Sequence, residues 1–305
     1  MHEATLTLGL PHTNRWGLAE HLLLMHAGHL HWTAIAATIG VPLSRLRAAD
    51  GGPVYATFYF IEEDFPEHAA LNTFGLDDAL RFRLEQRAYK RTAIEGELIF
   101  DRGDRLPPLA EDPSPTAPSM GRGRHPYVRF GNIFISPVKG NSRLRVAVPA
   151  QGDFSAFRVL PNEENPYQIT RAAAATGTLG LLDGRWRPAD AGGFDGLYDL
   201  DADRDTNGAG LIYFANYIAF MNAAERAAAA RSPVATMREG DARIVQQRRV
   251  AFYGNASPTD RIRTRVLLFH DPAAPRLMAA RSAIHRQEDD ELICLSETVK
   301  RSVSG

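Results

Sequence analysis

The chain has 305 residues, of which 44% are hydrophobic and 23% are charged, a composition typical of a globular protein with one large or two modest domains. Its 35 basic and 36 acidic side chains nearly cancel, which argues against a general polyanion binder, so no nucleic-acid partner is expected. The single cysteine, Cys294, excludes an intramolecular disulfide and a cysteine-based zinc site. Because the opening segment lacks the features of a signal peptide and no apolar run reaches the roughly 18 residues of a membrane span, we expect a cytoplasmic protein with no membrane partner.

The first third of the chain predicts one long helix followed by a meander of strands. Apolar residues recur at helical spacing over 18–39, and a Gly-Val-Pro sequence ends that run. The segment 54–61 is rich in β-branched and aromatic residues, as strands are. Over 80–84, apolar residues alternate with charged ones, and 94–100 is expected to be the antiparallel neighbour of that strand.

A segment rich in proline and glycine interrupts these patterns. Residues 105–127 have no hydrophobic period, which predicts a linker between a first unit over 1–104 and a second unit over 128–305. The second unit is expected to open with an irregular lead-in that includes short strands near 128–136 and 144–149. The stretch 160–196, rich in Gly, Ala and Pro, favours no particular element.

The second half repeats the order of the first. Asp205-Thr206-Asn207-Gly208 predicts a turn and a helix cap, followed by a helix over 211–230. An aromatic strand (244–254) and an arginine-alternating strand (261–266) follow, as they do in the first half, and two more strands end the chain near 276–286 and 292–300. A long helix wrapped by an antiparallel sheet, present twice, is an α+β double hot-dog fold.

The turn before the second helix carries a recognisable motif. Asp205-Thr206-Asn207-Gly208, followed by the segment Tyr213–Tyr217, resembles the motif that opens the central helix of hot-dog thioesterases and dehydratases. Those enzymes act on acyl thioesters of coenzyme A or of acyl carrier protein. Ala209 stands where those enzymes usually have a histidine, which argues against their chemistry here.

A narrower resemblance covers both halves. The segments 11–24 (PHTNRWGLAEHLLL), 53–60 (PVYATFYF), 205–217 (DTNGAGLIYFANY) and 248–262 (RRVAFYGNASPTDRI) resemble the bifunctional acyltransferase/decarboxylase family of leinamycin-type polyketide biosynthesis, in the thioesterase-like superfamily. The resemblance implies decarboxylation of a malonyl-type acyl-CoA, with methylmalonyl-CoA as the expected substrate, and transfer of the acyl group to an acyl carrier protein.

No resident cofactor is expected for this chemistry, because coenzyme A belongs to the substrate and phosphopantetheine to the carrier protein. Two alternatives stay open: a hot-dog acyl-CoA or acyl-ACP thioesterase or dehydratase, and a non-catalytic partner of an acyl carrier. The chain is expected to be a monomer or a homodimer, since two fused units already form an intramolecular pair.

Decarboxylation of a malonyl thioester needs hydrogen-bond donors for the enolate oxygen and groups that orient the departing carboxylate. The resemblance implies that Tyr59 is the tyrosine proposed as acyl acceptor in that family. A phenol with an ordinary pKa of about 10 donates a hydrogen bond more easily than it acts as a nucleophile. The alternative is a tyrosine packed on a strand, and Tyr55, expected on the same strand face, is the second choice.

Further candidates surround the expected start of the second helix. Asn207 and Gly208 are placed at its N-terminus, where free amides and the helix dipole bind a thioester oxygen, although Asn207 can equally be a simple cap. Tyr213 and Asn255 are expected to bind substrate, with an ordinary turn as the alternative for Asn255. Residues 14–17 hold the equivalent place in the first half and are a candidate second or degenerate pocket.

The remaining candidates are charged or titratable. His12 belongs to the shared opening motif and is a candidate to orient the substrate carboxylate or to protonate the enolate. Six of the ten histidines lie in the first 31 residues, but their spacing, with no cysteine or carboxylate pair, does not favour a metal site, so no metal is expected. Arg122, Arg124 and Lys139 are either phosphate contacts or ordinary surface charges.

Overall fold

The computed structural model describes residues 1–90, 92–103, 106, 123–139, 143–161, 165–190, 192–238 and 243–303. Most of the predicted linker 105–127, including Arg122, lies outside the described residues, as does the side chain of Lys139. Within the described ranges, no helix combines the length and the apolar character that crossing a membrane requires.

The first half folds as one helix against a sheet. Helix α1 (Glu20–Ile39) is followed by four strands: β4 (Tyr55–Asp64), β5 (Ala79–Lys90), β6 (Ala93–Arg102) and β7 (Tyr127–Lys139). They pair in the order β5-β6-β7-β4, so that the first strand after the helix bonds to the last, and β1 (His2–Thr7) adds to β5.

The second half repeats this topology. Helix α4 (Phe214–Arg231) is followed by β12 (Arg243–Phe252), β13 (Arg261–His270), β14 (Leu277–Arg286) and β15 (Leu292–Ser302). Their order is β12-β15-β14-β13, and the preceding strand β11 (Phe194–Asp199) adds to β13 as β1 adds to β5. The internal repeat and the double hot-dog fold predicted from the sequence are therefore confirmed.

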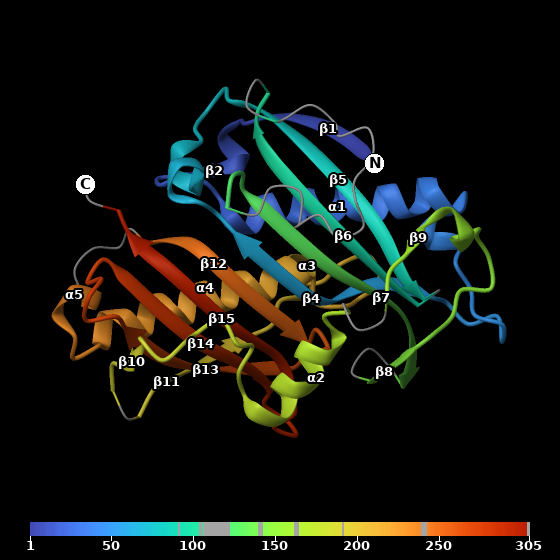
Figure 1. Ribbon diagram of the computed structural model, residues 1–305. Helices are drawn as coiled ribbons and strands as arrows, with labels where there is room; N and C mark the ends of the chain where they lie inside the picture. The colour runs from blue at the N-terminus through green and yellow to red at the C-terminus, as the bar shows by residue number, and fades with distance from the viewer. Residues whose placement is uncertain are drawn as a thin grey trace.

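The two units share one sheet and one core. Strand β4 pairs antiparallel with β12, which joins strands of both units into a single 13-stranded sheet; among the described strands, two short ones of the first unit (Thr13–Asn14 and Gly17–Leu18) pair separately. At this seam, Ile61 lies opposite Val250, and both belong to a buried apolar cluster that draws on both units. Helices α1 and α4 lie on one side of the sheet, whereas α2 (Tyr167–Thr176) lies on the other side, against β4 and β12 (Figure 1).

The boundary between the units lies later than the sequence predicted. Strand β7, which was assigned to the second unit, pairs with β6 and β4 and so completes the first sheet. The Pro- and Gly-rich segment is thus an insertion between two strands of one sheet. The connection between the units instead carries α2 and the short strands β8 (Arg143–Val146), β9 (Arg158–Val159) and β10 (Arg187–Pro188).

Helix α1 is apolar on most of its surface because the sheet wraps it and α4 contacts it. Leu24, Ala27 and Ile35 are fully buried, and the helix ends at Gly40, whose φ of 70° is the left-handed conformation common at helix ends. Helix α4 begins at Phe214, later than the predicted start at 211. The residues before it form an extended loop that an isolated bridge between Thr206 and Ile212 closes.

Candidate functional site

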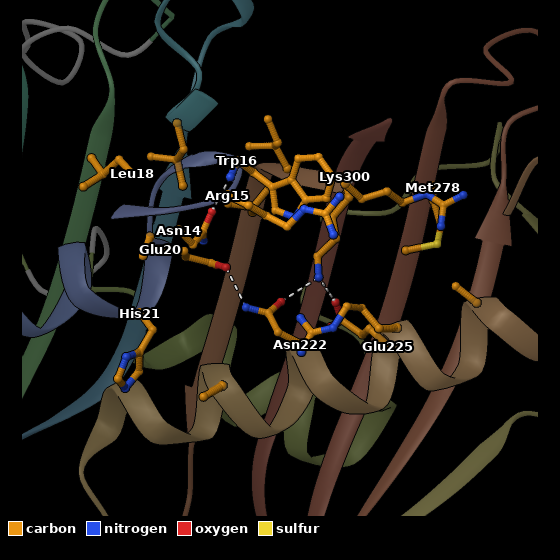
Figure 2. Close-up of a pocket in the computed structure, with 18 of the residues that line it drawn as sticks. Asn14, Arg15, Trp16, Leu18, Glu20, His21, Asn222, Glu225, Met278 and Lys300 are labelled. Carbon is orange, nitrogen blue, oxygen red and sulfur yellow. Dashed lines mark hydrogen bonds and ion pairs between the residues drawn. The ribbon is translucent and has the colours of Figure 1, made fainter. Parts of the chain in front are cut away.

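A cavity of about 640 Å³ opens between the two helices and the seam of the sheet (Figure 2). The hairpin of β2 (Thr13–Asn14) and β3 (Gly17–Leu18) covers one side, the N-terminus of α1 adjoins it, and α4 lies opposite. Strands β12, β14 and β15 also contribute to its lining. Part of the wall is apolar: Leu18, Leu71, Met237, Ile244, Val245 and Met278.

The most notable polar group of the wall is Glu20, in the first turn of α1. Its Oε1 accepts a hydrogen bond from Arg248 Nε at 2.8 Å, and its Oε2 accepts one from Asn222 Nδ2 at 2.8 Å. No side chain caps this helix at Ala19, and the amides of its first turn have no acceptor within the helix. Ala19, Glu20 and His21 all line the cavity, so the start of α1 and the fixed Glu20 carboxylate lie at the same side of it.

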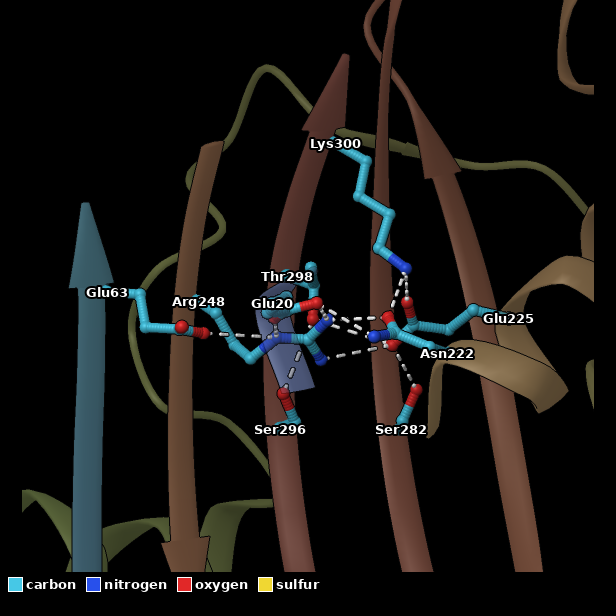
Figure 3. Close-up of polar contacts among 9 residues, drawn as sticks. All are labelled: Glu20, Glu63, Asn222, Glu225, Arg248, Ser282, Ser296, Thr298 and Lys300. Atoms are coloured by element: carbon cyan, nitrogen blue, oxygen red, sulfur yellow. Dashed lines mark hydrogen bonds and ion pairs between the residues drawn. The ribbon is translucent and has the colours of Figure 1, made fainter. Parts of the chain in front are cut away.

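The carboxylate belongs to a buried cluster that spans both units (Figure 3). Arg248, which is fully buried on β12, also donates to Asn222 Oδ1 at 2.8 Å and lies 3.6 Å from Glu225 Oε1. Lys300 Nζ donates to Asn222 Oδ1 at 2.6 Å and pairs with Glu225 Oε2 at 2.5 Å. Glu63 on β4 approaches Arg248 Nε only to 3.5 Å. Arg248 thus links α1 of the first unit to α4 of the second.

Glu225 and Glu63, the two fully buried carboxyl groups of this cluster, have pKa values shifted in opposite directions. Burial acts to raise the pKa of Glu225, but Lys300 and Arg248, together with a hydrogen bond from Ser282, outweigh it and hold that pKa below its usual value. Burial and the nearby charge of Glu20 raise the pKa of Glu63 well above its usual value, and Arg248 offsets this only in part. Glu225 is therefore the better stabilised anion.

Apart from Glu20 and Glu225, the charged side chains of the lining are basic. Arg15, Arg226, Arg238 and Arg243 line the cavity, and none of them forms an ion pair with a carboxylate of the described residues. Arg238 and Arg243 donate to main-chain carbonyl groups, and Arg15 stacks over the Trp16 ring. With Lys300 they outnumber the two carboxylates of the lining, so the cavity favours a ligand with anionic groups.

Tyr59 lies away from this cavity. The sheet register shifts between Phe58 and Phe60, and this bulge puts Tyr59 on the face that α2 covers, opposite the helices α1 and α4. Its hydroxyl donates to Asn165 Oδ1 at 2.7 Å, and burial raises its pKa, the opposite of what a phenolate nucleophile needs. Neither Tyr59 nor Tyr55 is among the lining residues, and their roles stay predictions.

The loop before α4 differs from the predicted cap. Asn207 closes a turn, because its Oδ1 accepts from the amides of Ala209 and Leu211 at 2.9 and 3.2 Å, and α4 begins only at Phe214. The predicted position of Asn207 and Gly208 at the helix N-terminus is wrong, since the turn is followed by the isolated bridge at Ile212 before the helix begins; Gly208 is exposed.

Asn255 is brought to this same loop. Its Oδ1 accepts from the Ile212 amide at 3.0 Å and from the Tyr217 hydroxyl at 3.2 Å, which ties the loop to the end of β12. Tyr213 precedes α4, with its ring against Phe214. None of Asn207, Gly208, Tyr213 and Asn255 lines the cavity, so their predicted contacts with substrate stay predictions.

His12 lies in a short 3₁₀ turn before α1, where its Nδ1 accepts from the Gly9 amide at 2.9 Å. It does not line the cavity, and Arg124 does not either. Across the part of the chain that the structure describes, no three His, Cys, Asp or Glu side chains are placed to share a metal ion.

The cavity includes one predicted segment and several residues that the sequence did not indicate. Residues 14–17 were a candidate second pocket, and Asn14, Arg15 and Trp16 do line the cavity. The residues that were missed are Glu20, Asn222, Glu225, Arg248 and Lys300. Arg248 begins one of the four segments that carried the family resemblance, which was the available signal.

Comparison with protein-family models gives no match, and comparison with curated proteins gives none either. Solved structures match over nearly the whole chain. An acyl-ACP thioesterase from Bacteroides thetaiotaomicron is 10% identical with a TM-score of 0.59, and the match covers 98% of this chain and 97% of that chain. The 12:0-ACP thioesterase from Umbellularia californica is 8% identical with a TM-score of 0.58, and covers 99% and 97% respectively. At these identities the comparison establishes the double hot-dog fold.

Proposed function

We propose that the chain is an enzyme that hydrolyses an acyl thioester in the cavity at the N-terminus of α1. The observation that carries this proposal is the Glu20 carboxylate, held by Arg248 and Asn222 inside the cavity and beside the uncapped first turn of the helix. Two further facts support it. The similar structures are described as acyl-ACP thioesterases, and the basic lining suits the phosphate groups of coenzyme A or of a carrier-bound phosphopantetheine.

The geometry suggests the following chemistry. Glu20 takes a proton from a water molecule as the water oxygen attacks the thioester carbonyl carbon. Negative charge then forms on the carbonyl oxygen, where first-turn amides of α1 donate hydrogen bonds. When the carbon–sulfur bond breaks, the thiolate leaving group takes the proton from Glu20. The products are the free acid of the acyl group and a free thiol, and Glu20 is again a carboxylate. Arg248 and Asn222 keep the Glu20 carboxylate in position throughout.

A second candidate is the decarboxylation of a malonyl-type acyl-CoA with transfer of the acyl group to an acyl carrier protein. It is favoured by Ala209, which replaces the motif histidine of hot-dog thioesterases, and by Lys300, whose ammonium group lies in the cavity wall and can attract a substrate carboxylate. Under this candidate, the same amides of α1 stabilise the enolate oxygen.

The test measures the products formed from acyl-CoA substrates. The purified chain is incubated with fatty acyl-CoA, malonyl-CoA and methylmalonyl-CoA, with and without a phosphopantetheinylated carrier protein, and products are identified by mass spectrometry. Hydrolysis gives free coenzyme A and the intact acid. Decarboxylation gives carbon dioxide with a propionyl or acetyl group on coenzyme A or on the carrier, and this outcome selects the second candidate.

Glu20→Gln tests the base directly. Because a general base contributes about 10²- to 10⁴-fold, we expect kcat to fall by that range while the fold is retained. Glu288→Gln is the matched control, since Glu288 is exposed and lies outside the cavity, and its kcat should equal that of the wild type. A Glu20→Gln variant with full hydrolytic activity would disprove the assigned base.

Tyr59→Phe separates the two candidates further. Because Tyr59 lies on the far face of the sheet, the variant should hydrolyse thioesters at the wild-type rate. If decarboxylation is observed and this variant loses it, the tyrosine predicted from the family resemblance acts in the reaction after all, and the cavity is not its site.

A further inference from the structure

Glu63 is an unusual member of the buried cluster. Its side chain has no exposed surface, and neither of its carboxyl oxygens receives a hydrogen bond from a donor group of the described residues. The carboxyl group that lies close to it, Glu20, can form a hydrogen bond with Glu63 only if one of the two carries a proton. It lies directly opposite Arg248 across the β4–β12 seam, yet Arg248 Nε is 2.8 Å from Glu20 and 3.5 Å from Glu63. A buried carboxylate that receives no hydrogen bond and has no close positive partner is strongly unfavourable.

Four elements place charged groups around Glu63. The acidic groups are Glu20 on α1 and Glu225 on α4. The basic groups are Arg248 on β12 and Lys300 on β15. Arg248 and Lys300 balance two carboxylates, which are Glu20 and Glu225, since both accept short hydrogen bonds or ion pairs. The third carboxyl group therefore has no positive charge of its own.

We infer that Glu63 is a neutral carboxylic acid in the folded chain and a positioning residue for Glu20, because its neutrality leaves Arg248 Nε to the Glu20 carboxylate. The role in positioning rests on the proposed function; the neutrality does not. If Glu63 loses its proton, it competes with Glu20 for Arg248, and the anchor of the reactive carboxylate weakens.

The neutrality is tested without any assay of activity. In D₂O near neutral pH, the infrared difference between wild type and Glu63→Gln should contain the carbonyl band of a protonated carboxyl group. The melting temperature should also respond, because the unfolded chain releases this proton at a lower pH than the folded chain does, so the proton stabilises the fold less as pH rises. Glu63→Gln should therefore gain stability relative to wild type as pH rises from the ordinary pKa of a glutamate, 4.5, towards neutrality.

Positioning is tested by the pH profile of kcat/KM. Wild type should lose activity as pH rises above neutrality and Glu63 loses its proton, by up to about tenfold per pH unit. Glu63→Gln, which cannot ionise, should lack this alkaline limb. Glu62→Gln is the matched control: Glu62 lies next in sequence, on the opposite face of β4, paired with Arg249, and its variant should keep the wild-type limb.

The outcomes separate the two proposals. An absent infrared band, with Glu63→Gln destabilised equally at every pH, would overturn the inference. A band with an unchanged alkaline limb in Glu63→Gln would overturn the positioning role. A chain that shows the band and the stability slope but turns over no thioester would refute the proposed function and still support the neutral Glu63.

Discussion

At the scale of single residues, the buried side chain of His31 makes the stability of the fold depend on pH. It is fully buried on α1 between the rings of Phe58 and Phe130, and burial lowers its pKa to about 3. The unfolded chain takes up a proton near pH 6.5 and the folded chain does not, so stability is lost as pH falls from about 6.5 towards 3. His31→Asn should reduce this loss by up to about 1.4 kcal/mol per pH unit in urea unfolding between about pH 6 and pH 4. The exposed His29→Asn serves as control and should keep the wild-type slope, whereas an equal slope in both variants would contradict a buried neutral His31.

At the scale of elements, the contact between α1 and α4 depends on Gly28. A Cβ atom at this position would lie 2.6 Å from Phe214 Cζ and 3.4 Å from Phe58 Cε2, so a larger residue forces the buried ring of Phe214 to move. Alanine favours a helix interior over glycine by about 0.8–1 kcal/mol, yet we expect Gly28→Ala to lower the free energy of unfolding by about 1–3 kcal/mol through overpacking. Urea titration measures this, with Gly184→Ala, which meets no atom within 4 Å, as control. If Gly28→Ala instead raised the free energy of unfolding, α1 and α4 could move apart without loss of stability, and the prediction would be wrong.

The same scale shows what a sequence can predict. The order of helices and strands was predictable, because apolar periodicity is local and occurs twice in the same order. The face on which Tyr59 lies was not, because one extra residue at the bulge after Phe58 reverses the alternation along β4. Nor was the charged cluster, since Glu20 resembles any acidic residue of a first helical turn, and Arg248 meets it only through the pairing of β4 with β12.

At the scale of the whole molecule, the repeated units should behave as one folding unit. The main apolar cluster includes Phe58 and Ile61 of the first unit with Ile218 and Val250 of the second, and the sheet crosses the seam without a break. We therefore expect a single unfolding transition in urea, with the same midpoint by far-UV circular dichroism and by tryptophan fluorescence. Trp16 and Trp32 report on the first unit, and Trp186 lies beyond it. Two separate midpoints would show that each unit is stable alone.

The position of Arg248 has a consequence for which amino-acid substitutions this protein can accept during evolution. One guanidinium group holds Glu20 from the first copy of the ancestral repeat and Asn222 from the second, so an exchange at either position alters the fitness of exchanges at the other. Because one side chain contacts both halves, a change in one half alters the surroundings of a residue in the other. In a set of natural variants, positions 20, 222 and 248 should therefore covary across the two halves, and in a double-mutant cycle the effects of Glu20→Gln and Asn222→Ala should not be additive.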